Sequence, residues 1–154
     1  MSPSTVHTTD NAGTFRLSER DVAHAHGLAR IALGVNIALH GMTRIPGAPA
    51  FLARLNEQFA PTFLPLPLVE FAGWAILISE SILGVLLILG LFVRASLTAV
   101  TMLFIVLLFG TCLSQQFSVA TTQMTYLIFI VPLLATAAYD GYSIDRLRRT
   151  NARP

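Results

Sequence analysis

The sequence predicts an all-α integral membrane protein, built as a four-helix bundle with a short amphipathic interfacial helix between the first two spans. The 154 residues are 54% hydrophobic and only 12% charged, whereas soluble domains are typically about 25% charged. Their mean hydropathy is +0.67. Four apolar runs also approach or exceed the ~20 residues that a helix needs to cross a bilayer. Runs of this kind must be helical in lipid, because their backbone polar groups have to be satisfied within the segment.

The expected spans cover residues 22–42, 66–93, 95–113 and 121–140, all within one membrane domain of residues 22–142. A polar arm, residues 1–21, precedes this domain, and a basic tail, residues 143–154, follows it. The arm lacks a basic segment followed by a short apolar core, so the first span is expected to act as an uncleaved anchor. Pro132 predicts a kink in the fourth span.

The first loop contains a second kind of helical pattern. In "AFLARLNEQFAP" the apolar side chains recur at helical spacing, opposite arginine, asparagine, glutamate and glutamine. This pattern favours a short helix on the outer face of the membrane. Its apolar positions are Phe51, Leu52, Leu55 and Phe59.

The distribution of arginine predicts the orientation. Two arginines lie in the first loop, whereas seven lie in the arm, the link after the second span and the tail. Because basic residues concentrate on the cytoplasmic side, both termini are expected there, in a bacterial inner (plasma) membrane. The seven are Arg16, Arg20, Arg94, Arg146, Arg148, Arg149 and Arg153, and the two are Arg44 and Arg54.

Ionisable residues within the first two spans are the main functional signal. At ~100° per residue, one face of the first span carries two arginines and two glycines, with His40 at its edge. The second span repeats the arrangement with two glutamates and two glycines. Small residues let helices approach closely while buried charges meet each other rather than lipid, so these faces are expected to pack together. The faces are Arg30, Gly34, Ile37, Gly41 and Arg44, and Glu70, Gly73, Leu77, Glu80 and Gly84.

Counting depth along the helices predicts two layers of pairing. Arg30 would pair with Glu80 in an inner layer, and His40 with Arg44 would meet Glu70 in an outer layer. Two interpretations remain open. The layers could only fix helix packing, or they could bind a polar ligand head such as a quinone ring or relay protons.

The sequence offers little evidence for other functional classes. A single cysteine, Cys112, excludes an internal disulfide, and no zinc, phosphate-loop, dinucleotide or Ser-His-Asp pattern occurs. No metal site is predicted. His26 and His40 would lie ~21 Å apart along one helix, too far to share a haem iron, so haem is not expected. The arginines are scattered among apolar runs rather than gathered on a basic face, so nucleic acid is not an expected partner.

The two polar spans resemble the DoxX family. "RIALGVNIALHGMTRI" is similar to the family's first-helix pattern, in which arginine and glycine precede His-Gly and a basic residue. "ESILGVLLILGLFVRA" is similar to the second-helix pattern, a glutamate before a glycine-rich run ending in Gly-Leu-x-x-Arg. The resemblance covers residues 28–145. The positions that match the recurrent polar residues are Arg30, His40, Arg44, Glu80 and Arg94.

The resemblance implies a small four-helix membrane protein, often a subunit of a quinone-linked oxidoreductase such as thiosulfate:quinone oxidoreductase. It does not imply thiosulfate chemistry here. The expected function is therefore an accessory subunit of a quinone-linked redox complex, in contact with lipid and with other membrane subunits and without a complete active site of its own. The alternative is a non-catalytic assembly subunit of a larger respiratory or photosynthetic complex. A transporter is disfavoured because no inverted repeat or pair of broken helices is present.

Overall fold

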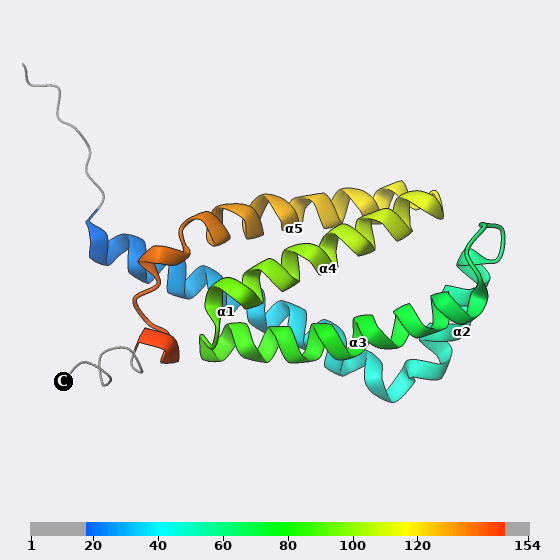
Figure 1. Cartoon of the computed structure of the whole chain (residues 1–154), viewed down its shortest axis with the longest axis horizontal. Coiled ribbons are helices and arrows are strands. Elements are labelled where there is room, and N and C mark those ends of the chain that lie inside the picture. Colours follow the sequence, from blue (N-terminus) through cyan, green and yellow to red (C-terminus); the bar gives the residue numbers. More distant parts are fainter. Residues whose placement is uncertain (1–17, 147–154) are drawn as a thin grey trace, which may run out of the picture.

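The computed structural model describes residues 18–146, and every regular element in this part of the chain is helical (Figure 1). The arm up to residue 17 and the tail from residue 147 lie outside the described residues, and they carry four of the nine arginines used to predict orientation. The helices are α1 (Glu19–Arg44), α2 (Ala48–Phe59), α3 (Leu66–Leu89), α4 (Val93–Leu113) and α5 (Phe117–Ala135), with 3-10 turns η1 (Ile45–Gly47) and η2 (Ala137–Tyr139).

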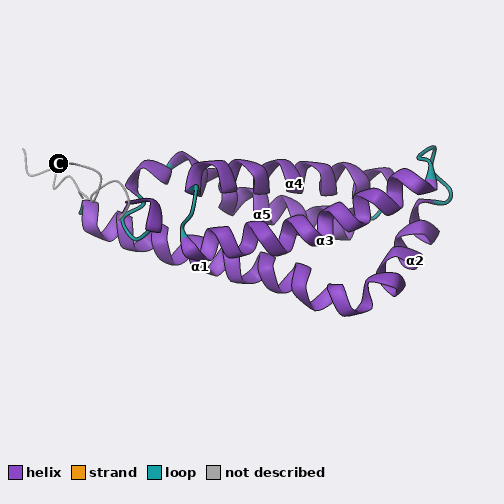
Figure 2. Cartoon of the chain, turned by 60° about the horizontal axis from the view of Figure 1, so that its bottom comes forward, coloured by secondary structure: helices purple, strands orange, loops and turns teal. Residues whose placement is uncertain are grey.

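Helices α1, α3, α4 and α5 are each long and apolar enough to cross a membrane, which confirms the predicted all-α bundle. They run along a common long axis, with α2 at one end (Figure 2). The start of α1 and the segment after α5 meet at the opposite end, called the terminal end below. The helix limits differ from the expected spans chiefly at the terminal end. Helix α1 starts at Glu19, where the Ser18 hydroxyl accepts a hydrogen bond from the Arg20 N–H, and α5 stops at Ala135.

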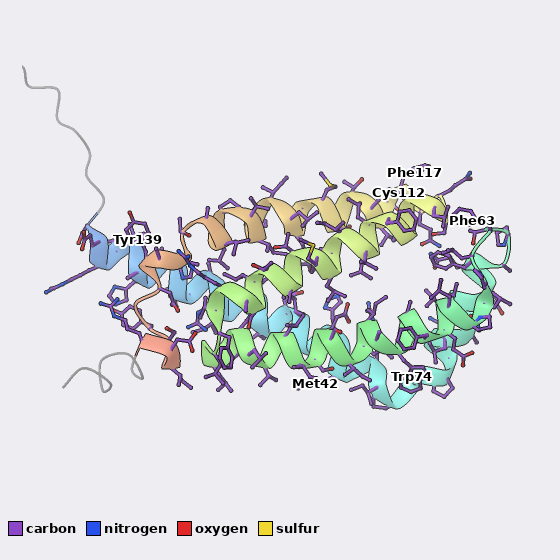
Figure 3. All side chains as sticks on the ribbon, viewed as in Figure 1. Met42, Phe63, Trp74, Cys112, Phe117 and Tyr139 are labelled. Atoms are coloured by element: carbon purple, nitrogen blue, oxygen red, sulfur yellow. The ribbon has the colours of Figure 1, made fainter. Side chains whose placement is uncertain are left out.

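The bundle consists of two helix pairs, α1 with α3 and α4 with α5, joined by a shared apolar core. Four aliphatic side chains of this core have no exposed surface: Leu87, Leu97, Val100 and Ile130. Large apolar side chains also point outward from all the long helices, including Met42 and Trp74 (Figure 3). Because these outward faces are apolar, they match a hydrocarbon surrounding rather than water.

Glycine and alanine bring α1 and α3 into backbone contact. A Cβ placed on Gly84 would lie 2.4 Å from the Ala38 nitrogen, and one on Gly41 would lie 2.7 Å from the Ser81 nitrogen. A Cβ on Gly34 would lie 2.9 Å from the Gly84 carbonyl oxygen. The predicted packing of the two faces is therefore confirmed at Gly34, Gly41 and Gly84, whereas Gly73 meets α2 instead of α1. The three close approaches fix the register of the two helices.

A glycine with a left-handed backbone ends α3. Gly90 has φ of 67°, and the hydrogen bonds from Leu91 N to Leu86 O and from Gly90 N to Leu87 O form a Schellman motif. A Cβ here would also lie 2.7 Å from the Cβ of Ser143. Position 90 therefore needs glycine both for its φ and for the close approach of the chain that follows α5.

Helix α2 has the apolar face that the sequence predicts, and that face packs against protein. Leu52 and Phe59 are buried. A Cβ on Gly73 would lie 2.5 Å from the Leu52 side chain, and one on Gly110 would lie 3.2 Å from the Phe59 ring. Helix α2 therefore covers the first turns of α3 and reaches α4.

Candidate functional site

The register of α1 against α3 decides which opposite charges meet. Arg44 Nη1 lies 3.4 Å from Glu80 Oε2, and Glu70 is exposed. Arg30 lies near the last turn of α3, beyond the reach of Glu80. The predicted pairings Arg30–Glu80 and His40/Arg44–Glu70 are therefore wrong. The depth count assumed level helix ends, whereas α1 extends past the end of α3 and turns into α2 at Arg44.

Arg30 has no exposed surface and binds the end of α3. Its guanidinium donates hydrogen bonds to the carbonyls of Leu87 and Ile88, and Nη2 donates to the Tyr142 carbonyl at 3.0 Å. The last carbonyls of a helix lack intrahelical partners and carry partial negative charge, so a cation there is stabilising. Arg30 thus serves as a cap for α3 as well as a buried charge.

The counter-charge of Arg30 is Asp140, in the segment after α5. Asp140 Oδ1 lies 3.6 Å from Arg30 Nε and 3.6 Å from His26 Nδ1, and all three side chains are buried. His26 Nε2 lies 3.0 Å from the Leu133 carbonyl oxygen. His26, Arg30 and Asp140, called the charged cluster below, tie α1 to the end of α5.

The residues after Asp140 hold the terminal end together. Asp145 Oδ2 accepts a hydrogen bond from the Val93 N–H at 3.0 Å, at the N-terminus of α4, where negative charge is favourable. The Asp145 N–H donates to the Gly90 carbonyl at 3.2 Å. The beginning of the predicted tail is therefore part of the bundle.

His26 and Asp140, the partners of Arg30, were not among the predicted site residues. The useful signal was Asp140 itself, an acidic residue at the end of the expected fourth span. A buried arginine in the first span needs a partner, and the chain leaving a short fourth span returns to the level of Arg30. His26 lies one turn before Arg30 on the same face of α1.

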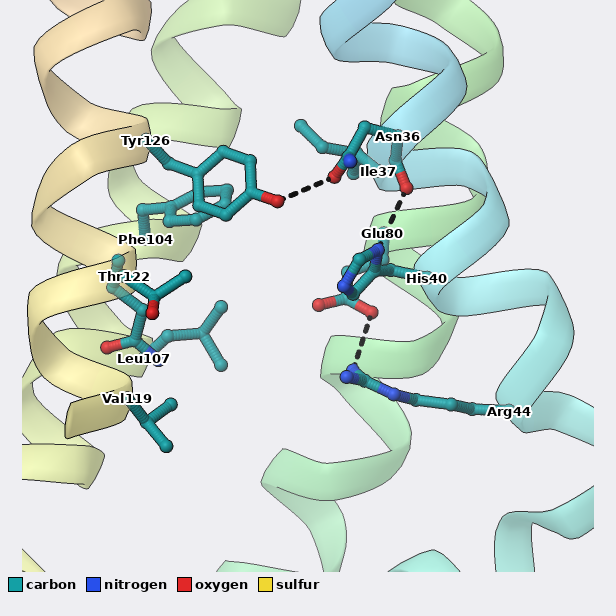
Figure 4. Close-up of a pocket in the computed structure, with 11 residues that line it drawn as sticks. Asn36, Ile37, His40, Arg44, Glu80, Phe104, Leu107, Val119, Thr122 and Tyr126 are labelled. Atoms are coloured by element: carbon teal, nitrogen blue, oxygen red, sulfur yellow. Dashed lines mark hydrogen bonds and ion pairs between the residues drawn. The ribbon is translucent and has the colours of Figure 1, made fainter. Parts of the chain in front are cut away.

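A polar cavity lies near the other end of the bundle, between the α1–α3 pair and the α4–α5 pair (Figure 4). It has a volume of about 140 Å³ and is open on one side. Three residues of the predicted cluster reach it, namely His40, Arg44 and Glu80, whereas Arg30 and Glu70 do not. The remaining walls come from Asn36, Ile37, Phe104, Leu107, Val119, Thr122, Gln123 and Tyr126.

Hydrogen bonds orient the polar groups of the cavity. The Tyr126 hydroxyl donates to Asn36 Oδ1 at 3.0 Å, across the space between α5 and α1. His40 Nδ1 lies 3.1 Å from the Asn36 carbonyl oxygen, which can only accept, so Nδ1 carries the proton. His40 Nε2 remains as the ring atom for a further partner. The Gln123 Oε1 accepts from Thr111, which leaves the amide NH2 of Gln123 as a donor.

The cavity presents hydrogen-bonding groups with little net charge. Arg44 and Glu80 neutralise each other, with the carboxylate side chain 8% exposed and the arginine side chain 41% exposed. The wall opposite the ion pair is mostly apolar, formed by Phe104, Leu107 and Val119. This arrangement suits a neutral ring with hydrogen-bonding oxygens. Within residues 18–146, no group of three His, Cys, Asp or Glu side chains could hold a metal ion.

Comparison with known proteins identifies one family. The family model described as DoxX matches residues 26–111, which include most of α1, all of α2 and α3, and most of α4. No curated protein and no solved structure matches the chain. The matched region contains Arg30, His40, Arg44 and Glu80. Since the match covers more than half of the sequence, and four helices fit a bilayer, this chain is an integral membrane protein that belongs to the DoxX family.

Proposed function

We propose that this protein is an accessory membrane subunit of a quinone-linked redox complex, and that its polar cavity binds the quinone head. The observation that carries the proposal is the set of hydrogen-bonding groups around a neutral, partly apolar space: the ring of His40, the Arg44–Glu80 ion pair and the Tyr126 hydroxyl. When bound, a quinone would serve as a lipid-soluble carrier of electrons and protons. The chain supplies donors for its carbonyl oxygens.

The size of the cavity fits the head of such a molecule. Pockets that enclose a whole drug-sized ligand are usually about 300–1,000 Å³, whereas this one measures about 140 Å³. It would hold a single ring and leave the rest of the molecule outside. The apolar wall formed by Phe104 and Leu107 would cover one ring face, while the amide NH2 of Gln123 would donate to a ring oxygen and Nε2 of His40 would accept from a hydroxyl of the reduced ring.

Binding of a benzoquinone without a side chain, to purified protein in nanodiscs, tests the proposal. Loss of one hydrogen bond to a neutral ligand costs ~1 kcal/mol, so Gln123→Leu, which removes the amide donor from the cavity, is expected to raise Kd by about fivefold. Glu80→Gln, which removes the partner of Arg44, is expected to weaken binding as well. Glu70→Gln is the matched control, because it makes the same change on α3 at an exposed position outside the cavity. Equal affinity for the benzoquinone in the unaltered protein and in all three variants would refute the proposed site.

A non-catalytic assembly subunit is the second candidate function. The observation in its favour is that Arg30, the most buried charge, lines neither the polar cavity nor any exposed surface and only joins elements of the chain. Gentle detergent extraction followed by sizing distinguishes the two. Migration only as a single species of 16.7 kDa plus detergent would defeat the assembly role, whereas co-migrating redox proteins would identify the complex.

The proposed location is a bacterial inner membrane, with the terminal end of the bundle in the cytoplasm. The arginine distribution supports this orientation. It places the charged cluster near the cytoplasmic side and the polar cavity nearer the outer side.

A further inference from the structure

A second, apolar cavity lies between α1 and α5, directly beside the polar one. It measures about 390 Å³ and shares two lining residues, Asn36 and Tyr126, with the polar cavity. Its other walls are apolar: Ala29, Ala32, Leu33, Phe129 and Leu133. The two spaces therefore meet at the hydrogen bond between the Tyr126 hydroxyl and Asn36.

The cavity is a groove that follows the helix axes. Its residues on α1 run from position 29 to 36, and those on α5 run from 126 to 133. Each stripe is therefore ~10 Å long. Hydrogen bonds join α1 and α5 at both ends of the groove, His26 to the Leu133 carbonyl at one end and Tyr126 to Asn36 at the other. Between these ties, Ala29 and Ala32 are too small to fill the space, which leaves the groove.

We propose that this groove, called the tail groove below, holds the apolar chain of the molecule whose head lies in the polar cavity. The inference rests on the proposed function and extends it, because it names the ligand class: a quinone with a long hydrocarbon side chain rather than a small water-soluble one. The shared residues carry the argument. A head between His40 and Tyr126 has the tail groove as its apolar neighbour, because Asn36 and Tyr126 line both spaces.

The charge of the polar cavity distinguishes a quinone from a phospholipid, which also combines a polar head with apolar chains. A phosphate head would require an unpaired cation, but Arg44 already pairs with Glu80. A neutral head with carbonyl oxygens needs only donors, which the amide NH2 groups of Gln123 and Asn36 offer, since the amide oxygen of each already accepts a hydrogen bond. The groove also faces outward, as the 68% exposure of Phe129 shows, so a chain can reach it from the lipid.

The test compares two ligands and two substitutions in nanodiscs. The ligands are a benzoquinone with a ten-carbon alkyl chain and the same ring without the chain. Ala32→Phe fills the tail groove, and Ala25→Phe makes the same change on α1 at an exposed position outside it. Ala32→Phe is expected to raise the Kd of the chain-bearing quinone by about tenfold and to leave the chainless one within twofold. Ala25→Phe is expected to change neither.

Each other result has a defined meaning. If Ala32→Phe leaves both affinities unchanged while Gln123→Leu weakens both, the tail groove is wrong and the quinone site stands. If neither quinone binds the unaltered protein, the proposed function fails first. An equal loss of affinity for both ligands in Ala32→Phe also overturns the inference, because filling the tail groove should leave binding of the head unchanged.

Ala29→Leu, a smaller change one turn away, repeats the test should Ala32→Phe fail to fold. Displacement of the chain-bearing quinone by an anionic phospholipid, with no displacement by its chainless parent, would assign the groove to lipid instead.

Discussion

Replacing Gly84 by alanine is the sharpest test of how the bundle is held together. The added Cβ would lie 2.4 Å from the nitrogen and 2.6 Å from the Cα of Ala38. Both atoms belong to the backbone of α1, so no side chain can rotate away. Ordinary van der Waals contact begins near 3.4 Å. The two helices must therefore move apart by about 1 Å at this point.

The loss of stability in Gly84→Ala follows from that separation of the two helices. A gap of 0.5–1 Å forfeits about a quarter to a half of the dispersion energy of each contact across it, and overpacking typically costs about 1–3 kcal/mol. The movement also stretches the Arg44–Glu80 contact, which is already 3.4 Å long. We expect Gly84→Ala to lower the free energy of unfolding by about 2–3 kcal/mol.

Reversible unfolding in mixed micelles of sodium dodecyl sulfate, followed by circular dichroism, measures this change. Gly47→Ala is the control, since Gly47 has φ of −103° and nothing lies within 4 Å of the added Cβ. Gly47→Ala is expected to change the free energy of unfolding by no more than about 0.5–1 kcal/mol. An increase is the expected direction, because alanine restricts the unfolded chain more than glycine does. Adding Ala38→Gly to Gly84→Ala should not restore stability, because the clash is with backbone atoms. A loss for Gly84→Ala no larger than that for Gly47→Ala would refute backbone contact between α1 and α3.

Two further predictions concern the charged cluster and the orientation. Asp140→Asn removes the counter-charge of a buried arginine and is expected to lower the free energy of unfolding by about 3 kcal/mol in the same assay. Glu70→Gln, at an exposed site, should lower it by less than about 0.5 kcal/mol. Equal effects of the two substitutions would show that Asp140 does not neutralise Arg30. In a Cys112→Ser background, a membrane-impermeant maleimide applied to intact cells should label Phe63→Cys, in the loop before α3. It should not label Phe92→Cys, at the terminal end, and the reverse pattern would overturn the proposed orientation.

Much of the fold could be predicted because composition and periodicity act locally. A bilayer imposes a helix on each apolar run, so four spans followed from length and hydropathy alone. The packing of α1 on α3 also followed, since glycines beside charges mark a helix–helix contact in lipid. The amphipathic pattern around Leu52 and Phe59 predicted α2, although not that its apolar face is buried against α3 and α4.

The pairing of charges could not be predicted, because it depends on the register between helices. A shift of ten residues along α3 separates Glu70 from Glu80, which is ~15 Å of helix. That shift is set by where Gly41 and Gly84 meet their neighbours and by how far α1 extends before it turns. Local patterns carry no information on either. The partner of Arg30 was harder still to find, since Asp140 lies outside the helices and reaches the arginine only because α5 ends early.

The two polar sites differ in a way that bears on function. In the charged cluster, every wall is protein: Arg30 is fully buried and its donors are directed at Asp140 and at backbone carbonyls, so removing a member should cost stability. In the polar cavity, by contrast, His40 and Arg44 are accessible and the space beside them is open. A charged group that only holds helices together is not stabilised by an opening toward lipid, because hydrocarbon offers it no hydrogen-bonding or ionic partner. This difference supports the proposal that a ligand binds beside the ion pair on its Arg44 side, while the closed cluster holds the helices that shape the cavity.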